Sequence, residues 1–473
     1  MKLKNEMQWS DLLNWQRPGL AGLNDIDPAR PPWQMDYDRI VFSSAFRRLQ
    51  DKTQVFPLSD SDYVRTRLTH SLEVSTVART LGMMAGAIVL SRHGQETVRR
   101  YPKGKETVST LSETFSTADF GSIVAVAALA HDLGNPPFGH SGEDAVRYWF
   151  INSPCGKAAR ETVKQAALAR EFELWEGNAQ GFRILTSLQL YRDKGGMRLT
   201  NATLGAFTKY PISAIEAGPG KRWEKFGFFS AESNIFNSIA KTLGLLRNSN
   251  GGWCRHPLAY VMEAADDVCN PIVDFEDGAR LGCIAYQDSN KLLLSILPAQ
   301  EQTAAKKRLQ DEPDDNSRIG YLRALAIREL IKQVSASFKK NESQILRGKY
   351  ESELILDTPA GRSGGILNEI KDRIKKDIYT HFNIVETEAA GFEVIGGLLD
   401  LFWTAVDEAA NGRLSYRSKK ILQRIPMEFV GKDMVPDNDP YLRLLRITDF
   451  VTGMTDQYAL SLFRKLKGIT LSS

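Results

Sequence analysis

The stretch DFGSIVAVAALAHDLG, residues 119–134, is apolar on nearly every side of the helix that its residues favour. A surface helix needs a polar face, and this segment has none before His131 and Asp132. Such a helix is stable only when protein surrounds it, so the chain must build a core around it. We predict a buried helix that is stopped by Gly134 and the two prolines that follow.

The rest of the sequence continues this helical pattern. Apolar residues recur every three or four positions over residues 71–90, and residues 256–269 and 391–409 are predicted to be further buried helices. Alternating strand patterns are scarce, and the best candidate is GKYESELILD, residues 348–357. We therefore predict an all-α fold with at most a small β-hairpin.

The composition predicts one large helical domain over residues 1–473. The chain is 42% hydrophobic and 25% charged, which is the balance of an ordinary globular protein, and no change in composition divides it. Three stretches are predicted to be loops or surface insertions, namely residues 94–117, 212–227 and 300–316.

Charge and cysteine content restrict the classes of partner and compartment. A net charge of +4 is small for 473 residues, so it demands neither a nucleic acid nor a membrane surface. No uncharged apolar run approaches the roughly 18 to 20 residues of a membrane span, and the first residues lack the apolar core of a secretory signal. The four cysteines include no C-x-x-C pair, so we expect reduced thiols and a cytoplasmic protein without a membrane partner.

Two of the six histidines and two carboxylates form a candidate metal site. His131 adjoins Asp132 at the end of the buried helix, His70 lies near the start of another helix, and Asp266 lies in the apolar stretch MEAADDVC. Two imidazoles and two carboxylates suit Mn²⁺, Fe²⁺, Mg²⁺ or Zn²⁺. A single His-Asp pair is more often a surface pair or a cap, and a buried acid more often pairs with arginine. Their joint occurrence in apolar helices favours the metal site.

The turn after Gly134 carries a candidate for proton transfer. We predict a new helix with Ser141 as its N-cap, and His140 and Glu143 flank its start, where backbone N–H groups favour anions. A histidine there can act as general acid or base toward a phosphoester, with Glu143 fixing its tautomer. The alternative is that both residues only cap the turn and satisfy helix electrostatics. Arg67 lies one helical turn before His70, so it could contact the same phosphate group as a metal ion bound by His70.

Six motifs between Arg47 and Leu460 resemble, in order, those of the deoxyguanosine triphosphate triphosphohydrolase (dGTPase) family of the HD-domain phosphohydrolase superfamily. The motifs are RRLQDKTQVFPL, VRTRLTHSLEV, HDLGNPPFGHSGEDA, EGNAQGFRIL, MEAADDV and VTGMTDQYAL. The resemblance implies an HD-type helical core at about residues 40–290 and a C-terminal helical portion at about 317–473. It also implies site residues: the metal ligands His70, His131, Asp132 and Asp266, with Asp267 in place of Asp266 if the register is off by one, and the catalytic pair His140 and Glu143.

The resemblance assigns further residues to a nucleotide. Those for the phosphates are Arg67, Asn178, Lys209, Tyr210 and Lys225. Gln54 and Asp274 match residues that contact the 3′-hydroxyl of the sugar, and Asp400 falls near a carboxylate that contacts guanine, or is simply an exposed acid on a helix. Asn270 and Pro271 stand where the family often has an aromatic residue against the 2′ edge of deoxyribose, so the choice of sugar and base stays open.

The implied activity is hydrolysis of a deoxynucleoside triphosphate, with dGTP preferred, to the deoxynucleoside and tripolyphosphate. The implied cofactor is a divalent ion, Mn²⁺ or Mg²⁺ first, with Fe²⁺, Co²⁺ or Zn²⁺ as alternatives. Relatives usually form homo-oligomers, often hexamers, and some bind single-stranded DNA. Two alternatives are another HD-type nucleotide phosphohydrolase and a nucleotide- or DNA-binding regulator with little turnover. The presence of all four ligands together with His140 and Glu143 favours an enzyme.

Overall fold

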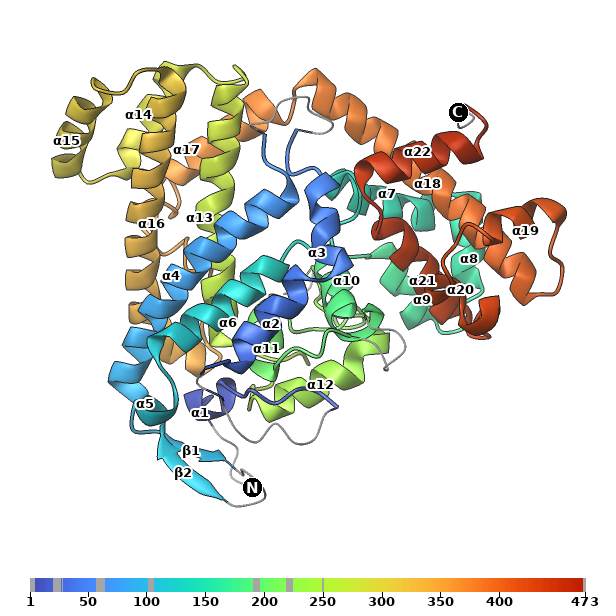
Figure 1. Cartoon of the computed structure of the whole chain (residues 1–473), viewed down its shortest axis with the longest axis horizontal. Coiled ribbons are helices and arrows are strands. Elements are labelled where there is room, and N and C mark those ends of the chain that lie inside the picture. The colour runs from blue at the N-terminus through green and yellow to red at the C-terminus, as the bar shows by residue number, and fades with distance from the viewer. Residues whose placement is uncertain are drawn as a thin grey trace.

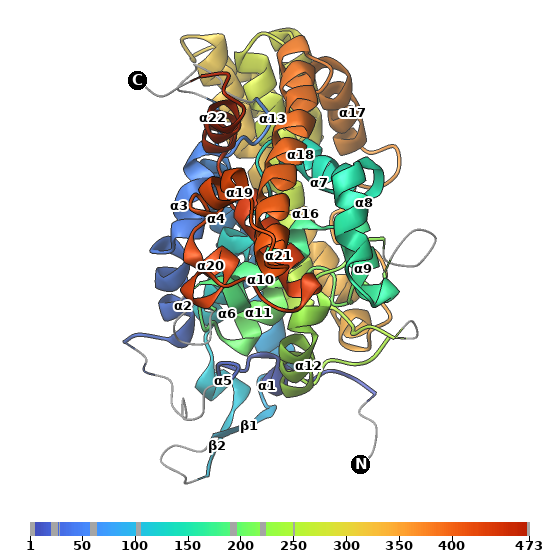
Figure 2. The same ribbon diagram turned by 90° about the vertical axis from the view of Figure 1, so that its right-hand side faces the viewer.

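The computed structural model describes residues 5–19, 27, 29–56, 64–100, 106–189, 196–217, 224–248 and 251–470. Helices make up most of this part of the chain (Figures 1 and 2). Its only named strands are β1 (Thr97–Arg100) and β2 (Thr107–Thr110), which pair antiparallel. The prediction of an all-α fold with a small β-hairpin is confirmed.

The first half of the chain contributes twelve α-helices. These are α1 (Trp9–Leu12), α2 (Pro32–Val41), α3 (Ser44–Arg48), α4 (Arg67–His93), α5 (Leu111–Thr114), α6 (Thr117–Ala130), α7 (Gly139–Asn152), α8 (Pro154–Glu161), α9 (Ala166–Glu173), α10 (Gly177–Arg183), α11 (Asn201–Phe207) and α12 (Ser233–Thr242). Short 3₁₀ turns lie at η1 (Leu49–Asp51) and η5 (Ser230–Glu232), and a π-helical segment lies at η3 (Ile184–Leu188).

The second half is dominated by longer helices. These are α13 (Pro257–Arg280), α14 (Tyr286–Ile296), α15 (Ala299–Leu309), α16 (Asp315–Leu346), α17 (Ile366–Arg373), α18 (Phe382–Ala410), α19 (Tyr416–Leu422), α20 (Met427–Val430), α21 (Pro440–Thr452) and α22 (Asp456–Leu466). A π-helical segment, η6 (Ile374–Ile378), extends α17, and a 3₁₀ turn lies at η7 (Lys432–Met434).

The predicted all-apolar helix is α6, and it is the centre of the fold. Every residue of 123–130 is buried, and α6 lies against α4, which also packs on α13 and α16 (Figure 1). The crossing of α4 and α6 is close because glycines lie on it. A Cβ atom on Gly82 would lie 2.8 Å from the carbonyl oxygen of Phe120 and 2.9 Å from Cα of Gly121. This close approach sets the distance between the helix that carries His70 and the helix that ends before His131.

The buried apolar side chains form two clusters. The first is built largely from α4, α6, α13 and α16, and the second from α7, α18 and α21 with α22 at its edge. The C-terminal helices therefore share a core with α7, the helix that follows the predicted metal-binding turn (Figure 2). The division into a core at about 40–290 and a C-terminal portion at about 317–473 stays a prediction.

The predicted strand at residues 348–357 is wrong. In this segment the chain forms turns, and Tyr350, Leu354 and Ile355 are buried in the core without strand pairing. These apolar residues pack into the core, and no named strand among the described residues pairs with the segment. The hairpin instead lies within residues 94–117, which were predicted as a loop, where Thr and Val favour the paired strands.

The prediction of a loop over residues 300–316 is also wrong. Helix α15 covers most of it, and only Ala305 and Leu309 of that helix are buried. Its sequence, AQEQTAAKKRL, consists mostly of strong helix formers, and this propensity outweighs the lack of a broad apolar face. The described residues of 212–227 form turns and loop, as predicted, while residues 218–223 lie outside the described part.

Two helices, α4 and α18, are long and apolar enough to pass a length and composition test for a membrane span. About half of each apolar window is buried inside the fold, 50% in α4 and 56% in α18. Both therefore have the character of core helices, and no membrane is indicated.

The close crossing of α4 and α6 gives a first prediction. Replacing Gly82 by alanine should lower the free energy of unfolding by about 1–3 kcal/mol, because the added methyl meets backbone atoms that cannot move away. The control is Gly320→Ala in α16, where the nearest atom would be 3.8 Å away. That change should raise stability by up to about 1 kcal/mol through helix propensity. Chemical unfolding measures both, and equal effects would contradict the close-packing account.

Candidate active site

A cavity of about 370 Å³ lies where α4, the turn before α7, α13 and the start of α18 meet. Every residue predicted for the site lines it except Asp400. The lining residues that were predicted are Gln54, Arg67, His70, His131, Asp132, His140, Glu143, Asn178, Lys209, Tyr210, Lys225, Asp266 and Asp274. Residues far apart in the sequence thus line one cavity.

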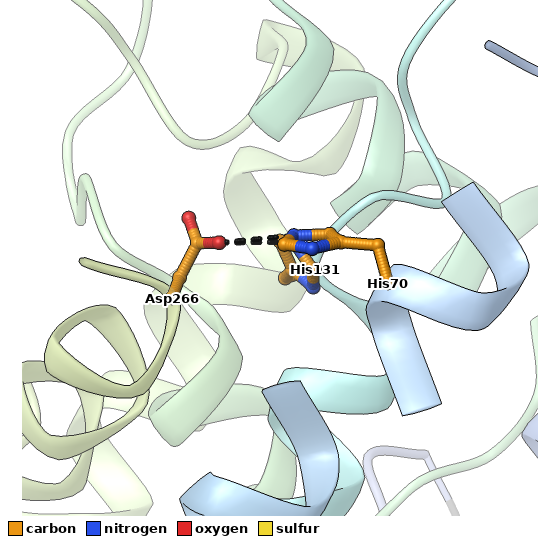
Figure 3. A group of neighbouring side chains, drawn as sticks. All are labelled: His70, His131 and Asp266. Atoms are coloured by element: carbon orange, nitrogen blue, oxygen red, sulfur yellow. Dashed lines mark hydrogen bonds and ion pairs between the residues drawn. The ribbon is translucent and has the colours of Figure 1, made fainter. Parts of the chain in front are cut away.

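At the base of the cavity, two imidazoles face one carboxylate (Figure 3). Nε2 of His70 lies 3.2 Å, and Nε2 of His131 3.6 Å, from Oδ1 of Asp266. One ligand atom from each of these three residues lies within 4.8 Å of the others, a spacing that allows one metal ion to bind all three. Asp132 adds its Oδ1 atom 3.4 Å from Nε2 of His131.

The protonation states at this group suit a cation. Nδ1 of His131 lies 2.6 Å from the carbonyl oxygen of Ala128, which can only accept, so this nitrogen carries a proton and Nε2 is the ring nitrogen that can face a metal ion. Burial raises the pKa of Asp132, but the charges of Arg67, His131 and His70 more than offset it and hold that pKa below its ordinary value. The donor set therefore fits a divalent ion with mixed nitrogen and oxygen ligands.

Asp266 and its neighbour Asp267 differ in their charge and in the groups that their side chains face. Burial raises the pKa of Asp266, but His131 and His70 lower it by more than burial raises it. The pKa therefore lies below its ordinary value, and this carboxylate is ionised. Burial and the nearby Glu263 raise the pKa of Asp267 to about 8, and its buried Oδ2 atom has no hydrogen-bond partner within the described part of the chain. Asp266 is thus the acid that faces the histidines.

Helix α13 runs without interruption through Pro271, so Asp266 and Asp274 lie two turns apart on a similar face. The hydroxyl of Tyr379 donates to Oδ2 of Asp274 over 3.1 Å. The amide of Gln54 donates to Oδ1 of Asn270 over 3.1 Å, and the buried Oε1 of Gln54 has no hydrogen-bond partner among the residues that the structure describes. This end of the cavity therefore offers oxygen acceptors for hydroxyl groups.

Helix α7 begins at Gly139 and not, as predicted, with Ser141 as its cap. Phe138 and Gly139 both adopt left-handed conformations, with φ values of 63° and 61°, and the N-cap is Phe138, three residues before the predicted cap. A Cβ atom on Gly139 would lie 3.0 Å from Nη2 of Arg67, so glycine also leaves room for that guanidinium. His140 consequently lies in the first turn of α7.

His140 and Glu143 differ in exposure. The His140 side chain is 85% exposed and its Nδ1 atom lies 3.9 Å from Oε2 of Glu143, which is itself buried. Glu143 also accepts a 3.0 Å hydrogen bond from the N–H of Gly177 and one of 3.2 Å from Arg147. The carboxylate is fixed, and the imidazole faces the opening of the cavity.

Several cationic side chains line the cavity, each paired with an acid. Arg67 donates to Oδ2 of Asp132 over 2.9 Å, and Nζ of Lys209 lies 3.0 Å from Oε1 of Glu263. Nζ of Lys225, whose side chain is 45% exposed, lies 3.8 Å from Oε1 of Glu176, which also accepts a 2.6 Å hydrogen bond from the Asn178 amide. The cavity thus presents positive charge opposite the carboxylates.

Comparison with known proteins gives the same assignment over nearly the whole chain. The HD domain family matches residues 67–179, which run from α4 into α10. A deoxyguanosinetriphosphate triphosphohydrolase-like protein of Synechocystis sp. is 40% identical over 98% of this chain and 100% of its own length. The chain belongs to the dGTPase family of HD-domain proteins. It is accordingly a hydrolase.

More distant members of the dGTPase family agree with this assignment. A like-named protein of Pseudomonas aeruginosa is 34% identical over 98% of this chain and 99% of its own length. A deoxyguanosinetriphosphate triphosphohydrolase of Enterobacter sp. is 28% identical over 92% of this chain and 94% of its own length. The similarity therefore extends well beyond the matched HD domain.

In this dGTPase family member, the structure does not place Asp400 at the cavity. Its Oδ1 atom accepts a 2.7 Å hydrogen bond from the Trp149 indole, which fixes α18 against α7. The prediction of a contact with guanine had placed this acid from sequence position alone. Residues 384, 387 and 388, at the start of the same helix, line the cavity instead.

Sequence reasoning also missed Tyr379 and Lys52. Tyr379 lines the cavity just before α18, where no motif of the family pattern marked it. Lys52 lies inside the motif RRLQDKTQVFPL, but a lysine is usually solvated, whereas this one is 3% exposed. Neither position carried a signal of spacing or residue type that could have predicted its place in the fold.

The burial of Asp274 gives a prediction about pH. Burial raises the pKa of Asp274 from 3.8 to about 7, although the charge of His70 and the Tyr379 hydrogen bond lower it. Its contribution to stability is therefore complete below pH 3.8 and is lost as pH rises through about 7. Asp274→Asn cannot ionise, so its stability relative to wild type should grow between pH 4 and 8. Unfolding of the metal-free proteins across that range tests this, and a constant difference would contradict it.

Proposed function

We propose that the protein is a metal-dependent hydrolase that converts a deoxynucleoside triphosphate, with dGTP preferred, to the deoxynucleoside and tripolyphosphate. The observation that carries this proposal is the meeting of His70, His131, Asp132 and Asp266 beside cationic side chains in one cavity. The relatives are named as triphosphohydrolases of deoxyguanosine triphosphate or as proteins like them, which supports the substrate class.

The four ligands would hold a divalent ion, Mn²⁺ or Mg²⁺ first, with Fe²⁺, Co²⁺ or Zn²⁺ as alternatives. Such an ion, when bound, lowers the pKa of a water molecule and offsets charge on the α-phosphate. The protein contributes the fixed geometry: Ala128 holds the His131 ring through Nδ1, and Arg67 holds Asp132. These outer contacts keep the ligand atoms directed toward one point.

The triphosphate would lie along the cationic wall. Arg67 is buried, and its Nε atom has no hydrogen-bond partner in the described part of the chain, so it can donate to a phosphate oxygen. Lys209 stays charged because Glu263 raises its pKa against the effect of burial. Lys225, Asn178 and Tyr210 line the same wall and can donate to the outer phosphates.

His140 would move the proton that the reaction requires. Cleavage between the 5′ oxygen and the α-phosphorus leaves an alkoxide that must take up a proton, and an exposed imidazole at the cavity can supply it. Oε2 of Glu143 lies 3.9 Å from Nδ1 of His140. His140 then acts as the general acid, while Glu143 orients it.

The sugar would lie at the opposite end, between Gln54 and Asp274. The unpartnered Oε1 atom of Gln54 and the carboxyl group of Asp274 can both accept from the 3′-hydroxyl. Asn270 lines the cavity beside them, where the family often has an aromatic residue. A homo-oligomer and binding of single-stranded DNA are further proposals, supported by the family resemblance alone.

The function is tested by product analysis in ¹⁸O-labelled water. The purified protein is incubated with each dNTP and rNTP, singly and mixed, over a series of divalent metals. We expect tripolyphosphate that carries one ¹⁸O atom, with dGTP hydrolysed fastest. Orthophosphate or a nucleoside monophosphate would instead indicate another HD-type phosphohydrolase. Binding without turnover under every condition would indicate a regulator.

The ligand register gives a separate prediction. Asp266→Ala should abolish stoichiometric metal binding, because it removes the carboxylate that both histidines face. The control Asp267→Asn changes the neighbouring acid and should retain the metal, since Asp267 is protonated at neutral pH. Metal content after gel filtration measures both variants. Loss of metal in Asp267→Asn and retention in Asp266→Ala would reverse the assignment.

His140 is tested by activity at full metal occupancy. His140→Ala should keep the ion bound and slow turnover by about 10²–10⁴-fold, which is typical for loss of an acid or base group. The control Asp144→Ala removes an exposed acid from the same turn of α7, where it pairs only with Arg147 among the contacts described, and should retain activity. Near-normal turnover in His140→Ala would return the residue to a capping role.

A further inference from the structure

The C-terminal motif VTGMTDQYAL has no part in the function proposed above, yet it contacts the active site. Its Asp456 is the first residue of α22 and is 2% exposed. A buried carboxylate needs donors, and the donors of Asp456 come from two segments that line the cavity. The residue therefore links the C-terminal helices to the site.

The two oxygens of Asp456 bind different segments. Oδ1 accepts a 3.0 Å hydrogen bond from the N–H of Phe138, and Oδ2 accepts one of 3.0 Å from the N–H of Thr53. The hydroxyl of Thr53 donates to the same Oδ2 atom. Phe138 precedes Gly139 and His140, while Thr53 precedes Gln54. One carboxylate thus holds the chain next to the proton donor and the chain next to the proposed sugar contact.

Lys52 makes a second link between the same segments. It is 3% exposed, and its ammonium group donates to the backbone carbonyl of Thr452 over 3.0 Å and to that of Asn135. The side-chain amide of Asn135 in turn donates to Oδ1 of Asp132, a proposed metal ligand. The end of α21 and the start of α22 therefore fix the turn between Asp132 and His140 at two points.

We propose that Asp456 is a positioning residue, which, with Lys52, holds the His140 turn and the Gln54 segment in register around the nucleotide. The reason lies in the conformation of Phe138, whose φ of 63° is unfavourable for a residue with a side chain. Such a conformation persists when the surroundings hold it, and the bond from Phe138 N–H to Asp456 is the one that fixes this peptide. The expected effect on catalysis rests on the proposed function, whereas the hydrogen bonds of Asp456 and Lys52 are independent of it.

The carboxylate is required because both of its oxygens accept from N–H groups. An asparagine of the same size has only one acceptor oxygen, so its NH₂ group would face the N–H of either Phe138 or Thr53. Asp456→Asn should therefore release one of the two segments while changing almost no volume. The expected loss is in the alignment of His140 with the substrate, not in the metal site.

The matched control is Asp36→Asn. Asp36 is 0% exposed, and its Oδ2 atom accepts from the N–H and the hydroxyl of Thr200 over 2.9 and 2.8 Å, the same pattern that Asp456 makes with Thr53. Its Oδ1 atom accepts from Arg17 over 2.5 Å. Asp36 does not line the cavity, so its loss should affect stability alone.

The experiment compares hydrogen exchange and steady-state kinetics in the full-length variants with metal bound. In Asp456→Asn, exchange should accelerate in peptides that contain Phe138 and Gln54, and kcat should fall by roughly 10- to 100-fold, as a misplacement of about 1 Å can cause. KM should rise as well, because Gln54 contacts the sugar. In Asp36→Asn, exchange should accelerate around Thr200 while kcat and KM stay near wild type.

Unchanged exchange at both peptides in Asp456→Asn would overturn the inference, as would equal kinetic losses in the two variants at equal stability. If Asp456→Asn does not fold, Thr53→Val removes only the hydroxyl donor, and it should accelerate exchange at the Gln54 peptide. No acceleration there would also overturn it. Exchange does not depend on turnover, so absence of dNTP hydrolysis by the wild type would reject the proposed function and leave this inference to be judged by exchange alone.

Discussion

The rest of the structure depends on one interaction, the contact of the ionised carboxylates of Asp132 and Asp266 with the imidazoles of His70 and His131 inside the protein. Desolvation opposes the charge on Asp132 and Asp266, but the neighbouring His131 and His70, with Arg67 beside Asp132, more than offset it, so the pKa of each acid lies below its ordinary value. A divalent cation would bind between these groups, and Nε2 of His131 is the ring nitrogen that can face it. The other features of the site supply charge and hydrogen bonds around this point.

The fold brings these groups together through close helix packing and one long helix. The glycine contact between α4 and α6 sets the separation of His70 and His131, while α13 carries Asp266 and Asp274 on one face through Pro271. The C-terminal helices then share a core with α7 and reach back to the turn before it. Asp456 therefore joins two segments that line the cavity, one at Phe138 and the other at Thr53.

Much of the site could be predicted because its chemistry depends on rare residue types in apolar contexts. His131 with Asp132 after an all-apolar helix, and Asp266 inside another, had few structural explanations other than a shared cation, and the family motifs supplied Lys209 and Lys225. The errors have physical causes. Residues 348–357 form turns whose apolar side chains pack into the core, and α15 forms through propensity without a broad apolar face. The contact of Asp400 with guanine stays a prediction, and Oδ1 of this residue accepts a hydrogen bond from the Trp149 indole. Tyr379 and Lys52 gave no pattern, since their roles depend on tertiary contacts alone.

The most direct test of the central claim is anomalous diffraction from crystals of the protein grown with Mn²⁺. The account predicts one strong peak within about 2.0–2.4 Å of Nε2 of His70, Nε2 of His131 and a carboxylate oxygen of both Asp132 and Asp266. Absence of a peak at this position in a crystal that holds Mn²⁺ elsewhere, or a peak bound by other residues of the cavity, would contradict it.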